Sequence, residues 1–132
     1  ERIEYATFCD IKKEDILIDP GIGFGKRTGR GIEDNCEILR RLSEIKELGH
    51  PIVVGASRKT FIGNVCGRGA QLPVTDRLEG SLASAALAVS NGADILRVHD
   101  VKETRRCIDI VDCIVRKVDK KTRKQEERID LT

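Results

Sequence analysis

Short apolar runs alternate along the chain with longer segments in which apolar residues recur every three or four positions. The runs lie at about 15–19, 52–56 and 94–99, and the periodic segments at about 38–48, 78–90 and 101–118. A short continuous apolar run predicts a buried strand, whereas three-to-four spacing predicts an amphipathic helix. The resulting order, βαβαβα, is typical of an α/β protein whose parallel strands are covered on both faces.

Capping and turn residues predict where these elements begin and end. Gly49 predicts a left-handed cap at the end of the first long helix. The spacings from Asp76 to Glu79 and from Asp100 to Glu103 match capping boxes, which predict side-chain caps at the next two helix starts. Between the second strand and Asp76 we expect a long loop, because glycine recurs there at Gly63, Gly67 and Gly69.

The charge balance argues against nucleic acid and membranes as partners. The chain has 24 basic and 22 acidic residues, a net charge of +2, and therefore no strong field to attract an anionic polymer or lipid surface. With one Tyr, three Phe and no Trp, it also lacks aromatic platforms for stacked bases. No apolar stretch is long enough to span a membrane.

The cysteines indicate a reducing compartment. Their number is odd and they contain no C-x-x-C pair, so we expect reduced, small core residues and a cytoplasmic protein without a signal peptide. Combined with His50 and His99, they match no spacing of metal ligands, and no protein ligand to a metal is expected within the chain. The five are Cys9, Cys36, Cys66, Cys107 and Cys113.

Polar side chains gather where each predicted strand ends. Successive side chains point to opposite faces of a strand, so residues two apart share a face. The carboxyl ends of parallel strands meet at one edge, where α/β proteins bind ligands. The polar positions that share a face are Asp19 on the first strand, Gly55, Ser57 and Lys59 on the second, and Arg97 and His99 on the third. We therefore predict one composite site; Arg58 has the opposite parity and is expected outside it.

Each of these groups also has a purely structural interpretation. Asp19 either caps its local turn or accepts two parallel hydrogen bonds from a planar ligand edge. Lys59 is either a surface lysine at a helix start or part of the site. Arg97 either pairs with Asp94 or Asp100, or acts with a neighbouring histidine as an anion clamp. The serines at 81 and 84 predict close helix packing without chemistry.

A glycine-rich loop, Gly21-x-Gly23-x-Gly25-Lys26, follows the first strand. It lacks both the Walker A spacing and the third glycine of the dinucleotide fingerprint, so neither common phosphate-binding motif is present. The alternative is a loop that only permits a tight turn from strand to helix. Within it, Lys26, Arg27 and Arg30 are interpreted as solvated charges.

Three strands cannot close a barrel, which takes roughly 250 residues, and they leave two open edges. Residues 1–10 have the pattern of the end of an earlier helix, and nine of the fourteen residues at 119–132 are charged, which predicts a solvated tail. We therefore expect residues 1–118 to form the C-terminal part of a larger domain.

Four motifs resemble those of the dihydropteroate synthase family. They are Asp-Pro-Gly-Ile-Gly-Phe-Gly-Lys at 19–26, Val-Gly-Ala-Ser-Arg-Lys at 54–59, Arg-Leu-Glu-Gly-Ser-Leu-Ala at 77–83 and Arg-Val-His-Asp-Val-Lys-Glu-Thr at 97–104. The resemblance covers residues 9–118. It implies a TIM (β/α)8 barrel of which this chain supplies the last three β/α units, strands six to eight, and a homodimer formed through helices at this end of the barrel.

The family condenses a dihydropterin carrying a hydroxymethyl diphosphate with 4-aminobenzoate, forming dihydropteroate in folate biosynthesis and releasing diphosphate. The resemblance implies that Asp19 holds the pterin's amino-pyrimidine edge, Lys59 contacts the pterin carbonyl and ring nitrogen, and Gly55 leaves room for the ring. Phe24 and Ser57 would border the aminobenzoate. The diphosphate would be bound by Arg97 and His99, which with Lys59 form the implied catalytic set.

The family mechanism is dissociative, so catalysis rests on positioning and on stabilising the leaving group. Mg²⁺ would assist by neutralising diphosphate oxygens. The magnesium ligand and the loops that close the site lie upstream in family members, so this chain alone is not expected to turn over.

Three alternatives stay open at this point. Methyltetrahydrofolate-dependent corrinoid methyltransferases resemble the family in barrel and pterin pocket, but they have no diphosphate to bind. An archaeal relative on the methanopterin pathway would use a ribosylated aminobenzene phosphate as the arylamine. A non-catalytic fragment that binds pterin or oligomerises is the third, and an upstream reading frame with strand–helix repeats would remove it.

Overall fold

The structure is a computed structural model that describes residues 1–24 and 31–117. The predicted tail at 119–132, and Gly25, Lys26, Arg27 and Arg30 of the glycine loop, lie outside the described residues. The helices are α1 (Arg2–Phe8), α2 (Ile32–Arg40), α3 (Leu42–Lys46), α4 (Thr60–Cys66), α5 (Leu78–Ser90) and α6 (Val101–Val111). The strands are β1 (Val53–Val54) and β2 (Ile95–Leu96), and the short 3-10 or π turns are η1 (Lys13–Asp15), η2 (Val74–Asp76) and η3 (Asp112–Arg116).

A small parallel sheet forms the centre of the molecule. β1 pairs with β2 in the register Val53 to Ile95, and Ile18 forms an isolated parallel bridge with Ile52. The Val53 N–H donates to the Ile18 carbonyl at 2.8 Å, which fixes this third, extended segment beside β1. The predicted strand order is confirmed. The first predicted strand is shortened to this bridge, because only one of its edges has a neighbour within the described chain.

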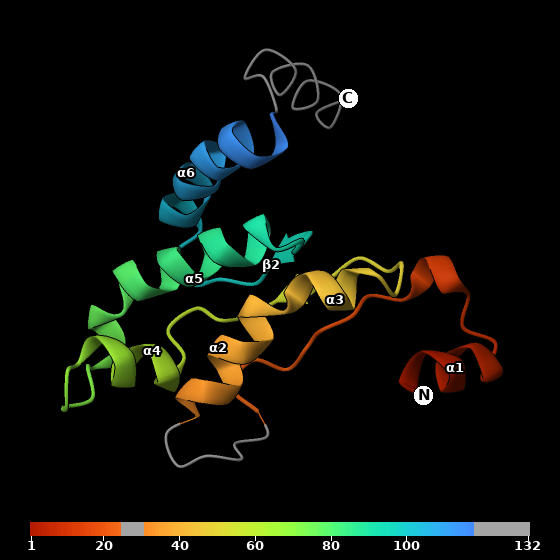
Figure 1. Ribbon diagram of the computed structural model, residues 1–132, viewed down its shortest axis with the longest axis horizontal. Helices are drawn as coiled ribbons and strands as arrows, with labels where there is room; N and C mark the ends of the chain where they lie inside the picture. The colour runs from red at the N-terminus through yellow and green to blue at the C-terminus, as the bar shows by residue number, and fades with distance from the viewer. Residues whose placement is uncertain (25–30, 118–132) are drawn as a thin grey trace.

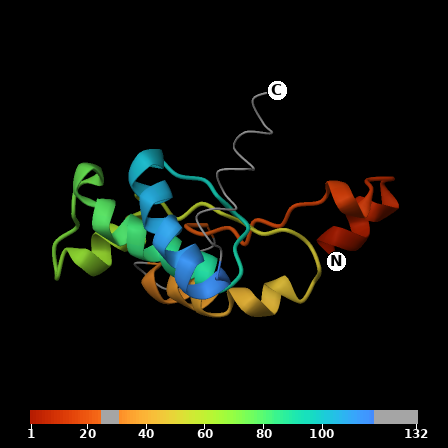
Figure 2. The ribbon, with the colours of Figure 1, turned by 90° about the horizontal axis from the view of Figure 1, so that it is seen from above.

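The helices cover one face of the strands. Ile52, Val54 and Ala56 point toward them and are buried, together with Phe61 and Ile62 of α4. A second, smaller cluster joins α5 to α6 through Ala85, Val89 and Ile108. Figures 1 and 2 show α1 apart from the other helices, at the far end of the extended segment that leads to the sheet.

The opposite face of the strands is open. Leu17 is 53% and Ile95 43% exposed, although both lie on strand segments. We predicted that both faces would be covered, but the described chain covers only one of them. The more extensive contacts between helices lie among α2, α3, α4, α5 and α6 and the turns beside them.

The first long helix is divided in two. Arg41, with φ −98° and ψ 17°, separates α2 from α3, and this break accompanies the complete burial of Leu42. The Asn91 side chain donates to the Leu39 carbonyl at 2.8 Å, satisfying a polar group near the end of α2. Gly49 has φ +78°, which confirms the predicted left-handed turn after this helical segment.

Helix α4 lies where a glycine-rich loop was predicted, so that prediction is wrong. Gly63 lies inside the helix despite its low helix propensity. Burial of Phe61 and Ile62 stabilises the helix, and a side chain at Gly63 would collide with Arg77, since an ideal Cβ lies 2.6 Å from its Nε. Tertiary packing therefore outweighs local propensity here.

A helix begins at each of the two predicted capping boxes, but neither side-chain cap forms. Helix α5 begins after η2, with Arg77 at the N-cap and no side-chain cap. Asp100 does occupy the N-cap of α6, but its side chain makes no capping hydrogen bond because Arg58 engages the carboxylate. An ion pair between two distant segments has replaced the local cap.

The cysteines are not core residues. Four are exposed and Cys107 is half-buried, because they lie on helix or turn surfaces that face away from the two apolar clusters. None of the five forms a disulfide. Among the helices at residues 1–24 and 31–117, none is both long enough and apolar enough to cross a membrane.

Candidate functional site

The three strand ends converge as the parity of the sequence predicts. Ser57, after β1, lies beside His99, after β2, with 3.0 Å between the serine Oγ and the histidine Nδ1. Arg97 reaches across β1 toward the extended segment that contains Ile18. Its Nη2 lies 3.9 Å from Oδ2 of Asp19 in that segment. Three segments that are far apart in sequence therefore bring a carboxylate, a guanidinium, a hydroxyl and an imidazole to one edge of the sheet.

Gly55 allows Arg97 to take this path. An ideal Cβ at Gly55 would lie 2.6 Å from Arg97 Nη2 and 2.9 Å from Cζ, so any side chain would meet the guanidinium. The space above Gly55, which the resemblance gives to a pterin ring, is occupied by Arg97 in this structure. The Arg97 side chain is 64% exposed.

Asp19 performs the structural role considered for it. Its Oδ1 accepts the Gly21 N–H at 2.8 Å and so caps the turn after the first segment. The second oxygen faces Arg97. The proposed structural partners of Arg97, Asp94 and Asp100, are engaged elsewhere, by Lys46 and Arg58 respectively, so that interpretation of Arg97 is wrong.

The Ser57 hydroxyl contacts two nitrogens of His99, the backbone N and Nδ1. Ser57 Oγ accepts the His99 backbone N–H at 3.2 Å, which leaves its own proton free to be donated to Nδ1. When Nδ1 accepts this hydrogen bond, the proton of the neutral imidazole is on Nε2. His99 then presents a hydrogen-bond donor to the exposed side of the site.

Lys59 lies against the glycine loop. Its backbone is the N-cap of α4, as expected of a lysine at a helix start, but the side chain is half-buried. Gly23, at φ +88°, makes room for it, because an ideal Cβ there would lie 3.0 Å from Lys59 Cδ. The Lys59 Nζ is 4.8 Å from the centroid of the Phe24 ring, within the range of a cation–π contact. Lys59 and Phe24 therefore form the side of the site next to the glycine loop.

Arg58 points away from this group, as its parity predicts. Its Nε and Nη2 donate to the Asp100 carboxylate at 3.1 and 2.5 Å. These hydrogen bonds lower the pKa of the Asp100 carboxyl and raise the pKa of Arg58. Ser57–His99 and Arg58–Asp100 thus form two adjacent links between the ends of β1 and β2.

Sequence reasoning missed three residues that hold these loops. Asn35 is buried, its Oδ1 accepts the Gly23 N–H at 2.6 Å, and its Nδ2 donates to the Gly31 carbonyl. Arg77 and Ser81 hold the backbone of Arg58. Asn35 carries no sequence signal, since a polar residue in the first turn of a helix is common. Ser81 was interpreted as helix packing, which is incomplete.

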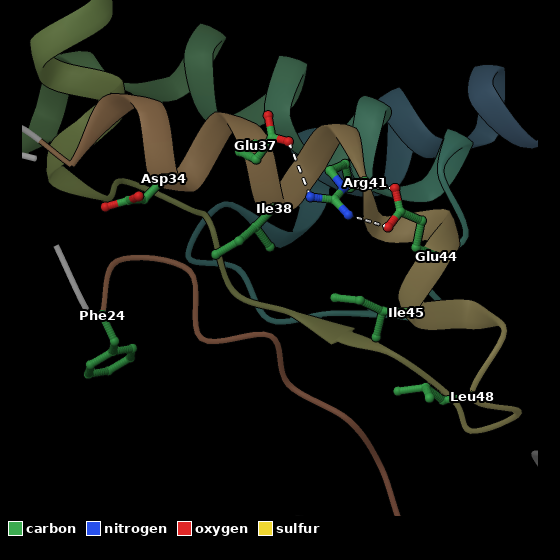
Figure 3. Close-up of a pocket in the computed structure, with 8 residues that line it drawn as sticks. All are labelled: Phe24, Asp34, Glu37, Ile38, Arg41, Glu44, Ile45 and Leu48. Carbon is green, nitrogen blue, oxygen red and sulfur yellow. Dashed lines mark hydrogen bonds and ion pairs between the residues drawn. The ribbon is translucent and has the colours of Figure 1, made fainter. Parts of the chain in front are cut away.

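A cavity of about 410 Å³ lies between α2–α3 and the extended segments (Figure 3). Ile38 and Ile45 point into it from the helices, Leu48 does so from the turn after α3, and Phe24 lies at its far end. An ion-paired row, Glu37, Arg41 and Glu44, forms its upper rim. Since Phe24 is the one strand-end residue among its lining residues, this cavity adjoins the candidate site and does not contain it.

The described residues do not supply a metal site. No group of three or more His, Cys, Asp or Glu side chains within residues 1–24 and 31–117 is placed to hold an ion. The magnesium expected from the family therefore has no ligand set here, and its involvement stays a proposal about residues beyond those described.

The chain is similar to known proteins over most of its length. The family model described as pterin binding enzyme matches residues 1–99. Dihydropteroate synthase of Clostridium beijerinckii is 43% identical over 118 residues, which make up 89% of this chain and 41% of that protein. This chain therefore spans about two fifths of the length of that relative.

Two solved structures are similar at the level of the fold. Dihydropteroate synthase from Clostridium difficile, determined in the presence of pteroic acid, is 46% identical with a TM-score of 0.76, over 85% of this chain and 40% of that one. The enzyme from Xanthomonas albilineans in complex with 7,8-dihydropteroate is 40% identical with a TM-score of 0.78, over 86% of this chain and 40% of that one. By the family match over residues 1–99 and these similarities, the chain belongs to the family of pterin binding enzymes.

Proposed function

We propose that this chain is a segment of a dihydropteroate synthase and supplies the pterin and diphosphate contacts of its active site. The observation that carries the proposal is the convergence of Asp19, Arg97 and Gly55 at one sheet edge. A carboxylate beside a mobile guanidinium offers one partner for an amino-pyrimidine edge and another for an anion a few ångströms away. The segment corresponds to the last three β/α units of a TIM barrel.

The open face of the strands supports this place in a barrel. Leu17 and Ile95 are apolar, exposed and on the same side of the sheet as the polar strand-end residues. In a closed barrel such side chains fill the interior, below a site formed at the carboxyl ends of the strands. Residues 1–118 would then be the C-terminal part of that barrel, followed by the charged tail at 119–132.

At the pterin end, Asp19 accepts hydrogen bonds from the ring's amino group and adjacent N–H. Lys59, already held between Gly23 and Phe24, donates to the pterin carbonyl and ring nitrogen. For the ring to lie over Gly55, Arg97 moves off this position and toward the diphosphate. Binding of the ligand therefore breaks the contact between Arg97 and Asp19. Asp19 then contacts the pterin, and Arg97 contacts the diphosphate.

At the diphosphate end, Arg97 and the Nε2–H of His99 bind the leaving group. The bond between the pterin methylene carbon and the diphosphate oxygen breaks first, and the electron pair leaves with diphosphate. The amino group of 4-aminobenzoate then forms the new carbon–nitrogen bond and loses a proton. The Arg97 guanidinium and the His99 N–H both stabilise the negative charge that develops on the diphosphate in the transition state. Such electrostatic stabilisation is usually the largest single contribution to catalysis.

Phe24 and Ser57 would border the aminobenzoate. Phe24 is 71% exposed and offers an uncovered aromatic face beside Lys59. Mg²⁺ would neutralise diphosphate oxygens when bound by upstream residues. Because those residues and the closing loops are supplied elsewhere, the chain alone is proposed to be inactive.

The anion-binding pair favours a synthase over a corrinoid methyltransferase with a pterin pocket. Such a methyltransferase has no diphosphate to hold, and an arginine and a histidine at one exposed edge would then lack a ligand. We also propose a cytoplasmic homodimer formed through α5, α6 and η3, on which the apolar side chains of Leu87, Ile110 and Ile114 are exposed.

A segment exchange tests the function. Residues 1–118 replace the matching part of the Escherichia coli dihydropteroate synthase, to which 112 residues of this chain are 42% identical. The chimera is expressed in a strain without its own synthase. We expect growth without supplied folate end products, and no growth when the chimera carries Arg97→Ala. A folded chimera that never supports growth would contradict the proposal.

A further inference from the structure

The turn between β1 and α4 contains a residue in an unusual conformation. Arg58 has φ +56°, in the left-handed region that residues other than glycine seldom adopt. Such a conformation is retained where surrounding contacts over-determine it, and these positions cluster at functional sites. Ser57 and Lys59, on either side of Arg58, both belong to the candidate site.

Both backbone polar groups of Arg58 are held by residues of or next to α5. Its N–H donates to Ser81 Oγ at 2.9 Å, and its carbonyl accepts from Arg77 Nη1 at 2.9 Å. The side chain is fixed separately by the ion pair with Asp100. The turn is therefore anchored at three points, two through the backbone of Arg58 and one through its side chain.

Burial and hydrogen bonds fix the position of the Arg77 side chain. It is only 6% exposed, and its Nε and Nη2 donate to the Leu72 carbonyl at 2.9 and 2.7 Å. Gly63 leaves the space that its guanidinium fills. Ser81 Oγ donates back to the Arg77 carbonyl at 2.7 Å, so the two anchors support each other.

We propose that Arg77 and Ser81 are positioning residues that hold Arg58 in its left-handed conformation, so that Ser57 meets His99 and Lys59 lies over Phe24. Neither residue touches the proposed ligand. For its effect on catalysis the inference rests on the proposed function, but the geometry it predicts can be measured on the chain itself.

The test uses the full 132-residue chain and two NMR signals. One is the exchange rate of the Arg58 amide hydrogen, which reports the bond to Ser81. The other is the ring-current shift that Phe24 imposes on the Lys59 ε-methylene protons, which a purely structural role for α5 would leave unchanged. Phe24→Leu identifies the ring-current contribution.

Ser81→Ala is the first variant, since alanine preserves helix α5. We expect Arg58 amide exchange to accelerate about tenfold, the scale of one hydrogen bond, and the Lys59 shift to move toward its Phe24→Leu value. Ser84→Ala is the matched control: Ser84 lies one turn further along α5 and bonds the Gly80 carbonyl instead. It should leave both signals unchanged.

Arg77→Lys is the second variant, because lysine keeps the charge but cannot span the Arg58 and Leu72 carbonyls together. It should move the Lys59 shift in the same direction as Ser81→Ala, and Ser81→Thr, which retains the hydroxyl, should restore the wild-type signals. If both Ser81→Ala and Arg77→Lys leave the two signals at wild-type values, the inference is overturned.

In the chimera, the same substitutions should lower kcat and raise KM for the pterin diphosphate together, whereas Ser84→Ala should change neither. An inactive wild-type chimera combined with altered NMR signals in Ser81→Ala would count against the proposed function and still support the positioning role.

Discussion

At Gly55, the absence of a side chain determines where Arg97 lies. We predict that Gly55→Ala displaces the guanidinium, because the added Cβ would lie 2.6 Å from Nη2. Arg97 is exposed and flexible, so the melting temperature should change little. Affinity for inorganic diphosphate, measured by calorimetric titration without a pterin so that no ring moves Arg97 from Gly55, should fall at least about tenfold, the scale of a hydrogen bond to a charged group.

A double-mutant cycle tests whether Gly55 acts through Arg97. Gly55→Ala and Arg97→Ala should each weaken diphosphate binding, and the double variant should lose no more than Arg97→Ala alone. Additive losses would show that Gly55 matters for some reason other than the path of this side chain.

Asp19 has two roles that substitution can separate. Asp19→Asn keeps an oxygen for the Gly21 N–H but removes the charge, whereas Asp19→Ala removes both. We expect Asp19→Asn to unfold at the wild-type temperature and to lose pterin binding, since a carboxylate is needed for paired charge-assisted hydrogen bonds. Asp19→Ala should also lower the melting temperature. Retained pterin affinity in Asp19→Asn would contradict the assigned role.

At the scale of the elements, Asp94 joins the sheet to α3. Its carboxylate accepts from Lys46 Nζ at 2.5 Å and from the Ile52 N–H at 2.8 Å. Burial alone would raise the pKa of Asp94, but the hydrogen bonds from Lys46 and Ile52 outweigh it, so the pKa lies below the usual 3.8. A lowered folded-state pKa stabilises the fold above the unfolded value and loses this effect as pH falls through the folded value.

Asp94→Ala should therefore reduce the free energy of unfolding near neutral pH by about 1 kcal/mol, the usual net value of such a hydrogen bond. The difference from wild type should shrink as pH falls below about 4. Urea unfolding at pH 7, 5 and 3 measures it. A difference that stays constant down to pH 3 would show that the charge of Asp94 contributes nothing.

Helices α4 and α5 approach each other closely at Gly80, where an ideal Cβ would lie 2.3 Å from Ile62 Cγ2. Gly80→Ala should lower stability by about 1–3 kcal/mol, because overpacking exceeds the helix-propensity gain. Thermal unfolding measures the change. In an Ile62→Ala background, which removes Cγ2, the same substitution should be neutral or stabilising; a loss of the same size there would refute the close-approach explanation.

The elements that the sequence predicts well are those fixed by local patterns. Apolar runs and three-to-four spacing predict the strand positions and α5, and parity predicts which polar side chains meet. The errors arise where distant contacts override local signals. Arg77 fills the space at Gly63 inside α4, Arg58 takes the Asp100 carboxylate from its expected cap, and burial of Leu42 accompanies the break between α2 and α3.

The residues of the candidate site also fall into those that local patterns predict and those that they do not. Parity locates Asp19, Ser57, Arg97 and His99 because strand geometry is local and periodic. Asn35 and Arg77 could not be predicted, since each acts on a backbone group that only the folded chain brings near.

At the scale of the whole molecule, the strands are covered on one face and open on the other, and the proposed site lies at the edge of the open face. Exposed apolar side chains such as Leu17 and Ile95 require partners that this chain does not supply among its described residues. The account therefore predicts that the strand-end residues become an active site only when the remaining strands are present.

The most direct test of this claim is diphosphate release by the purified chimera with the dihydropterin diphosphate and 4-aminobenzoate. The account predicts release that requires both substrates and falls by at least about tenfold in Asp19→Asn and in Arg97→Ala, each of which removes a charge-assisted contact. A folded, active chimera whose rate is unchanged by both substitutions would contradict the claim that these strand ends bind the pterin and its diphosphate.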